Sequence, residues 1–234
     1  EYGVYLRLLG LLRLMQGKYP QAREIMGQSI QTFLALDSDM DGRYAINIAG
    51  AYNYMAETYR LEGQYQAAFH CYDQAIAYNR SRGYYPGAAV IYTNYGVAAD
   101  QNGQRAEAKK LFQYAVDIYT DSHEYSGYPI ALSYLALYDA QEGRYDRAAQ
   151  QLRDALRLSE TIASPWWKGI TLYMSWKIRC LMEERGQKNE DLEAFWPALK
   201  EDHCRQCLSC LHQLQPRIET EEMERELKRI TGEP

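Results

Sequence analysis

Cysteine and histidine side chains gather in one short segment near the C-terminus, and no other segment of this chain looks better suited to chemistry. His203, Cys204, Cys207, Cys210 and His212 place three thiols at CxxCxxC spacing with a histidine on each side. Thiolate and imidazole groups are the ligands that zinc prefers in proteins. The spacing therefore raises metal binding or redox sensing as one hypothesis for this segment.

The same segment also has a packing interpretation, which we favour. No glycine or proline interrupts residues 203–212, whereas a thiolate site usually needs a chain that turns back on itself. Cysteine packs well as a small apolar residue. In a helix, one broad apolar face would contain Cys204, Cys207, Leu208, Leu211 and Leu214. We expect no cofactor, and zinc or iron analysis of the purified protein decides between the two interpretations.

Catalytic motifs are not recognisable elsewhere in the sequence. The chain shows no Gly-rich phosphate loop, nucleophile elbow, HExxH motif or carboxylate dyad in a recognisable context, and its histidines are scattered. We therefore predict a binding protein and no enzyme.

Composition limits the partners and the compartment. The 234 residues are 47% apolar with a net charge of -5, and a pI near 5.5 argues against a nucleic-acid face. No apolar run is long enough for a membrane span, and no secretory signal is visible. Five cysteines do not resemble a disulfide framework, so a reducing, cytoplasmic location is predicted. Because the chain opens inside an apolar helical pattern, we expect a fragment of a longer protein.

A repeated glycine marks the elements that must position any binding residues. Four glycines are each followed by an alanine five residues later, and the spacings between the glycines are 46, 40 and 40 residues. Apolar residues at helical spacing flank every glycine, so each unit reads as helix, tight turn, helix. The pairs are Gly17 with Ala22, Gly63 with Ala68, Gly103 with Ala108, and Gly143 with Ala148.

The second unit carries a family resemblance. Its first helix has Tyr52, Met55, Ala56 and Tyr59, and its second has Tyr65, Ala68, Tyr72 and Ala75. This pattern resembles the tetratricopeptide repeat, and the other three units follow it in register. The resemblance implies an all-α fold: a right-handed superhelix, or α-solenoid, of antiparallel helix pairs with four such repeats and a degenerate C-terminal capping repeat.

We expect a single domain over residues 1–234. Its repeats cover about 3–40, 41–84, 85–126 and 127–163, and a degenerate repeat with a cap covers 164–234. Helix starts are indicated at Asp41-Gly42, Tyr85-Pro86, Tyr128-Pro129 and Ser164-Pro165. The period exceeds the 34 residues of the family, and such long-period arrays resemble those of MalT-type bacterial transcriptional regulators, peptide-sensing regulators and kinesin light chains.

The resemblance also implies where a ligand binds. First helices line the concave groove of tetratricopeptide arrays. The carboxylate clamp of the family is disfavoured because only two units hold a residue that could serve at its asparagine position. The residues at that position are Leu8, Tyr54, Asn94, Tyr134 and Lys177, of which Asn94 and Lys177 could serve. Aromatic and amide groups suit an extended or helical peptide instead. The groove residues predicted for units two to four are Asn53, Glu57, Arg60, Thr93, Asn94, Val97, Asp100, Ser133, Tyr134, Leu137 and Gln141.

Two functional settings remain open at this point. One is the sensor or interaction module of a bacterial transcriptional regulator, whose ATPase and DNA-binding parts lie outside this chain. The other is a free-standing adaptor or scaffold for protein complexes. The expected partner is a protein or peptide segment, with a small-molecule effector and self-association as further options, and with neither nucleic acid nor membrane bound by this chain.

Overall fold

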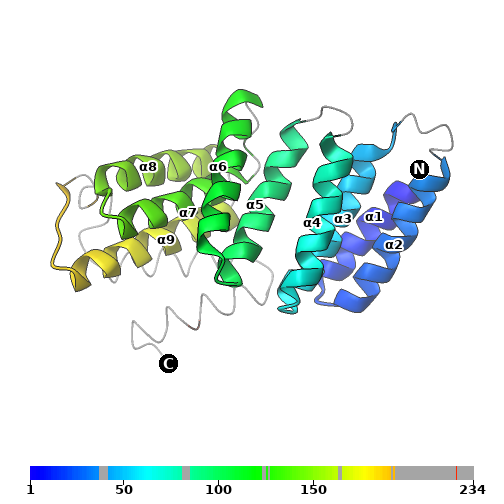
Figure 1. Ribbon diagram of the computed structural model, residues 1–234, viewed down its shortest axis with the longest axis horizontal. Helices are drawn as coiled ribbons and strands as arrows, with labels where there is room; N and C mark the ends of the chain where they lie inside the picture. Colours follow the sequence, from blue (N-terminus) through cyan, green and yellow to red (C-terminus); the bar gives the residue numbers. More distant parts are fainter. Residues whose placement is uncertain are drawn as a thin grey trace. The chain divides into compact units, whose positions relative to one another are not determined.

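The computed structural model describes residues 1–36, 42–80, 85–122, 125, 127–162, 165–190, 192 and 225. Every regular element in this described part is an α-helix (Figure 1). The helices are α1 (Tyr2–Met15), α2 (Tyr19–Leu36), α3 (Ala45–Leu61), α4 (Tyr65–Arg80), α5 (Tyr85–Gln101), α6 (Arg105–Ser122), α7 (Tyr128–Gln141), α8 (Tyr145–Thr161) and α9 (Pro165–Glu184).

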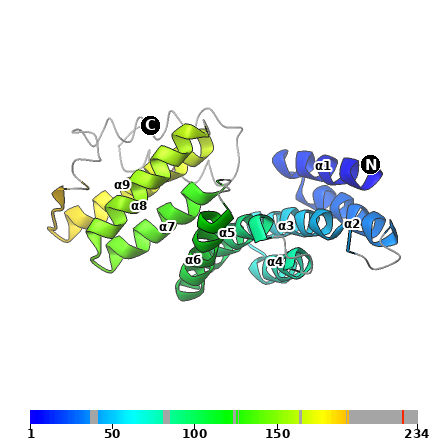
Figure 2. The ribbon, with the colours of Figure 1, turned by 90° about the horizontal axis from the view of Figure 1, so that it is seen from above.

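The helices pack in the order in which they occur in the chain, within two compact units, Glu1–His123 and Glu124–Pro234. In the first unit α1 pairs with α2, α3 with α4 and α5 with α6, and each second helix also packs on the next first helix. The first helices α1, α3 and α5 contact one another in turn (Figure 2). In the second unit α7 packs on α8, and α9 packs on both. The predicted all-α array of antiparallel helix pairs is confirmed.

Glycine ends the first helix of each pair, as the sequence predicts. Gly17, Gly63, Gly103 and Gly143 have φ between +70° and +81°, a conformation that costs glycine little. At Gly63 the glycine N–H donates to the carbonyl of Arg60 and the next N–H to that of Tyr59, both at 2.9 Å. This pair of bonds is the Schellman arrangement, which satisfies the last carbonyls of a helix.

Small residues at one register of the first helices allow each pair to approach closely. An added Cβ at Gly10 would lie 2.7 Å from the Met26 side chain, and one at Gly96 would lie 2.7 Å from Phe112. Ala56 and Ala136 occupy the same register and are fully buried. The steric pattern inferred from the sequence therefore describes the helix contacts.

Proline-containing starts are also found where the sequence predicts them. Helix α5 begins at Tyr85, α7 at Tyr128 and α9 at Pro165, whereas α3 begins at Ala45, three residues after Gly42. Gly186, with φ +60°, follows α9. From residue 193 onward, the degenerate repeat and cap expected over 164–234 lie outside the described residues apart from Arg225, and so does the cysteine cluster. Among the described helices, none is long and apolar enough to cross a membrane.

Candidate functional site

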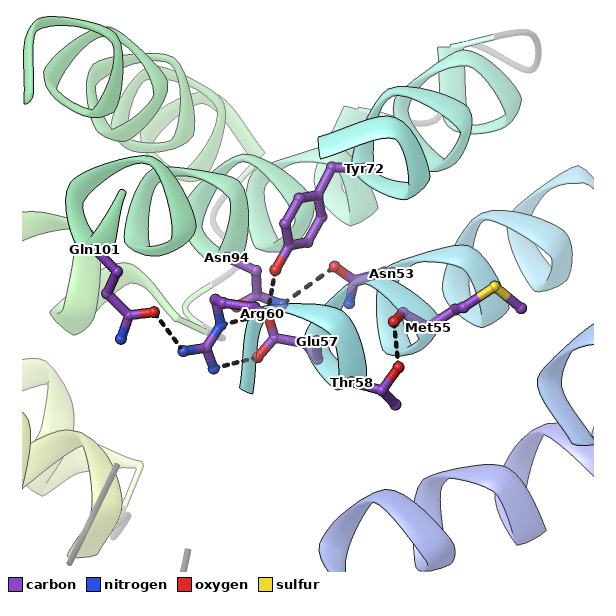
Figure 3. A network of polar contacts seen from close by, with 8 residues as sticks. All are labelled: Asn53, Met55, Glu57, Thr58, Arg60, Tyr72, Asn94 and Gln101. Carbon is purple, nitrogen blue, oxygen red and sulfur yellow. Dashed lines mark hydrogen bonds and ion pairs between the residues drawn. The ribbon is translucent and has the colours of Figure 1, made fainter. Parts of the chain in front are cut away.

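An asparagine pair lies where α3 and α5 run side by side. The Asn94 side-chain amide donates to the Asn53 side-chain oxygen at 3.2 Å (Figure 3). Asn53 is 5% exposed and Asn94 is half-buried. With the amides oriented in this way, the Asn94 oxygen and the Asn53 N–H groups have no hydrogen-bond partner within the described part of the chain. These are the groups that a peptide main chain can pair with.

A buried ion pair lies one helical turn further along α3. The Arg60 guanidinium binds both carboxylate oxygens of Glu57, at 3.0 and 2.8 Å, and its third nitrogen donates to the Gln101 side chain at 3.1 Å. The Tyr72 hydroxyl donates to the same Glu57 carboxylate (Figure 3). The Arg60 side chain is only 4% exposed, so the pairing compensates for the loss of solvation of its charge.

This network connects three helices around the asparagine pair. Glu57 and Arg60 come from α3, Tyr72 from α4 and Gln101 from α5. Because the two opposite charges neutralise each other, the face presents amides and hydroxyls more than net charge. The geometry therefore suits an uncharged polar ligand better than a strongly ionic one.

The other predicted residues of α5 divide between two faces. Val97 and Asp100 are half-buried. Thr93 is buried, its hydroxyl donates to the Ala89 carbonyl at 2.9 Å, and it lies 3.3 Å from the Tyr119 hydroxyl of α6. The structure therefore places the Thr93 hydroxyl against α6, where it serves the contact within the third helix pair.

The four predicted residues of α7 lie in the second unit and are more buried than a groove face requires. Ser133, Tyr134 and Leu137 are at most 8% exposed, and only Gln141 is half-buried. The Ser133 hydroxyl donates to the Pro129 carbonyl at 2.7 Å, and its oxygen lies 3.1 Å from the Thr171 hydroxyl of α9. All residues from 131 to 140 are buried, so the polar positions of α7 mainly serve packing in this structure.

Sequence reasoning missed two members of the site. Tyr72 matches the aromatic packing position of the repeat, and the pattern says nothing about the direction of its hydroxyl. Gln101 lies two residues before the turn glycine of its repeat, and Arg60 lies three residues before its own. Neighbouring first helices run side by side, so these matched registers are the signal that could have paired them.

Metal ligation finds no support in the described residues. No group of three or more histidine, cysteine, aspartate or glutamate side chains is arranged there to hold an ion. The cysteines described are Cys71, which is buried, and Cys180, which is partly buried. Cys204, Cys207 and Cys210 lie outside the described residues, and metal or redox sensing through them stays a prediction.

Helix pairs stacked through small residues, with a polar face on the first helices, define the class of helical-repeat interaction domains. Residues 47–121 match the family model described as tetratricopeptide repeat. The matched residues contain α4, α5 and nearly all of α3 and α6, and therefore the asparagine pair and the network around Arg60.

Solved structures agree with this fold at low sequence identity. RapI in its apo form matches with a TM-score of 0.63 at 12% identity, covering 100% of this chain and 85% of RapI. A Podosopora anserina protein titled as a kinesin light chain with nearly identical TPR-like repeats gives 0.59 at 16%, covering 91% and 97%. Pseudomonas aeruginosa PilF gives 0.56 at 20%, covering 98% and 92%. No curated protein matches this chain.

Proposed function

We propose that this chain is a non-enzymatic interaction module. It holds a peptide segment of another protein against the face of α3 and α5 that carries Asn53 and Asn94. The observation that carries the proposal is the asparagine pair, which offers an amide acceptor and amide donors on one face. Tetratricopeptide repeats as a class bind protein and peptide partners, and the described residues present no metal cluster that would indicate another chemistry.

The chemistry of this face selects a main chain more than a charged side chain. A peptide group carries one donor and one acceptor, and the Asn53 and Asn94 amides can satisfy both. Half-buried Val97, three residues after Asn94 on α5, offers an apolar contact on the same side of that helix. Glu57 and Arg60 compensate each other, so neither attracts an ionic ligand strongly. We therefore infer an extended or helical segment of low charge as the ligand.

The long repeat period favours a bacterial transcriptional regulator as the setting, with this chain as its sensor or interaction module. A free-standing adaptor or scaffold is the alternative. Reading the full-length gene tests this point: an upstream nucleotide-binding or helix-turn-helix segment supports the regulator, and its absence supports the adaptor. The binding role of the α3 and α5 face is common to both settings.

Peptide display tests the binding role directly. A random peptide library is selected on the full chain, and the affinity of the best synthetic peptide is then measured by calorimetry. Asn94→Ala should weaken binding about three- to tenfold, as expected for one lost hydrogen bond. Gln66→Ala is the matched control, since Gln66 is an exposed amide on α4. Equal affinity for the Asn94→Ala variant and the parent would reject the proposed face.

A further inference from the structure

Arg7 of α1 carries a guanidinium group that has no carboxylate partner in the described part of the chain. The side chain is half-buried and lies against α3, where its Nη1 atom is 3.7 Å from the position of a Cβ added to Gly50. Its guanidinium carbon lies 6.0 Å from the centroid of the Tyr54 ring. The Nε atom is buried and has no hydrogen-bond partner among the described residues. A buried donor without an acceptor costs free energy that an incoming acceptor would recover.

The helices on either side of this guanidinium supply no free carboxylate. Helix α1 contains no acidic residue, and α3 contains only Glu57. Both oxygens of the Glu57 carboxylate bind Arg60, and one of them also accepts from the Tyr72 hydroxyl. Arg60 is therefore compensated inside the fold, whereas α1 and α3 leave the partly desolvated charge of Arg7 available to an anion.

The repeat register places Arg7 on the face that carries the asparagine pair. Arg7 and Asn53 each stand ten residues before the turn glycine of their repeat, and Tyr54 and Asn94 each stand nine residues before theirs. In both cases the residue at position ten contacts the residue at position nine of the following first helix. Any first helix preceding α1 would by the same rule face Leu8. The surroundings of Arg7 on the α3 side therefore do not depend on what precedes α1.

We propose that Arg7 binds the carboxylate of an acidic side chain in the peptide that the asparagine pair holds, an inference that rests on the binding role proposed above. The paired N–H donors of a guanidinium match the two oxygens of a carboxylate. Neighbouring packed helices lie about 10 Å apart, and an extended peptide covers that distance in about three residues. The acidic residue therefore lies about three positions from the residue that pairs with Asn53 and Asn94. One carboxylate is compatible with a ligand of low charge.

Parallel peptide selections test this pairing. A random library, displayed with the C-terminus of each peptide fused so that only side chains supply carboxylates, is selected on the full chain and on its Arg7→Glu variant. Peptides selected on the parent should share an aspartate or glutamate, and peptides selected on the variant should carry lysine or arginine at that position. Acidic residues that occur equally often in both sets would overturn the pairing.

Calorimetry then measures the contact with the best parent-selected peptide, synthesised with an amidated C-terminus. Replacing its shared acid by the corresponding amide should weaken binding to the parent about tenfold, as expected for a charge-assisted hydrogen bond. The same replacement should have little effect on binding to Arg7→Gln. Arg13→Gln is the matched control, because it removes the same charge from α1 where the guanidinium donates to Gln16, and it should preserve the tenfold difference. Equal affinity of the parent for both peptides would overturn the pairing, whatever the stability of the variants.

The pairing and the proposed binding face can fail separately. If Asn94→Ala weakens binding and the acid-to-amide replacement does not, the asparagine pair holds the peptide and the pairing with Arg7 is wrong. If Asn94→Ala leaves the affinity unchanged, the binding face is rejected and the pairing with it. A free C-terminus should add less affinity than the acidic side chain. A larger gain from the free terminus would assign Arg7 to a chain end and overturn the side-chain pairing.

Discussion

At the scale of single residues, the face of α3 and α5 has two kinds of polar side chain. Some stabilise the fold, and others can contact a ligand. Arg60 is buried and its donors are used by Glu57 and Gln101, whereas the half-buried Asn94 uses one amide hydrogen for Asn53. Removing a scaffold residue should therefore change stability, and removing Asn94 should change binding.

Asn94 and Tyr134 were both predicted from sequence as contact residues, and their burial now separates their expected effects. Asn94→Ala removes one bond at a half-buried site, so the melting temperature should fall little. Tyr134 is 7% exposed, and Tyr134→Ala should cost about 3–5 kcal/mol by leaving a cavity. Thermal denaturation of both variants checks this, and an unchanged melting temperature for Tyr134→Ala would show that its ring does not support the fold.

Glu57 should be among the most stability-sensitive polar residues of the first unit. Glu57→Ala takes both carboxylate contacts from the buried Arg60 guanidinium and one from the Tyr72 hydroxyl. Breaking a buried pair by removing one partner costs about 3–5 kcal/mol. Tyr72→Phe removes only a hydroxyl and should cost about 1 kcal/mol. Urea denaturation that ranks the two variants in the opposite order would contradict the described network.

Alkaline pH should destabilise the first unit through two groups on α4 and α5. Burial raises the pKa of the Cys71 thiol from 9.0 to about 11 and, with the nearby Asp73 carboxylate, that of the Tyr95 hydroxyl from 10.0 to about 12. The folded state then keeps protons that the unfolded state loses. The stabilisation is complete below about pH 9 and is lost as pH rises to about 12. Melting temperatures between pH 7 and 11 should be flat and then fall, less steeply for Tyr95→Phe.

At the scale of helices, the glycines of this chain lie in different structural environments. Gly96 faces the Phe112 ring, Gly10 faces the flexible Met26 side chain, Gly63 has a positive φ with open space around it, and Gly27 lies inside α2 with nothing near. The four positions therefore separate crowding, backbone strain and helix propensity.

Alanine substitution at these glycines should give a graded series. Gly96→Ala should cost about 1–3 kcal/mol because a rigid ring must move, and Gly10→Ala less because methionine adapts. Gly63→Ala should cost about 1–2 kcal/mol from its left-handed backbone alone. Gly27→Ala is the control and should stabilise by up to about 1 kcal/mol. Chemical denaturation gives all four values, and destabilisation by Gly27→Ala would contradict the open surroundings of that position.

The helix pattern was predictable because its causes are local and repeat. The glycine with an alanine five residues later determines each turn, and proline marks several helix starts. Small residues at one register determine how closely the two helices of a pair approach. None of these features depends on residues far away in the sequence. The site was less predictable because it depends on the directions in which individual side chains point. The pattern placed Asn53 and Asn94 on one face, but it could not show that the Tyr72 hydroxyl reaches Glu57 or that Thr93 turns toward α6.

At the scale of the whole molecule, burial determines which first-helix positions are available to a ligand. In the first unit α3 and α5 keep half-buried polar positions, whereas α7 in the second unit is buried from residue 131 to 140. The candidate site is therefore best supported in the first unit, inside the segment that matches the tetratricopeptide repeat model.

The side-chain amide resonances of Asn53 and Asn94 give the most direct test of the proposed binding face. The full chain, labelled with ¹⁵N, is titrated with the peptide selected by display, and side-chain and backbone shifts are followed together. Both asparagine amides should shift with one shared affinity, while the exposed side-chain amide of Gln66 on α4 should stay in place. A saturable titration that leaves both asparagine amides unmoved would contradict the proposed binding face.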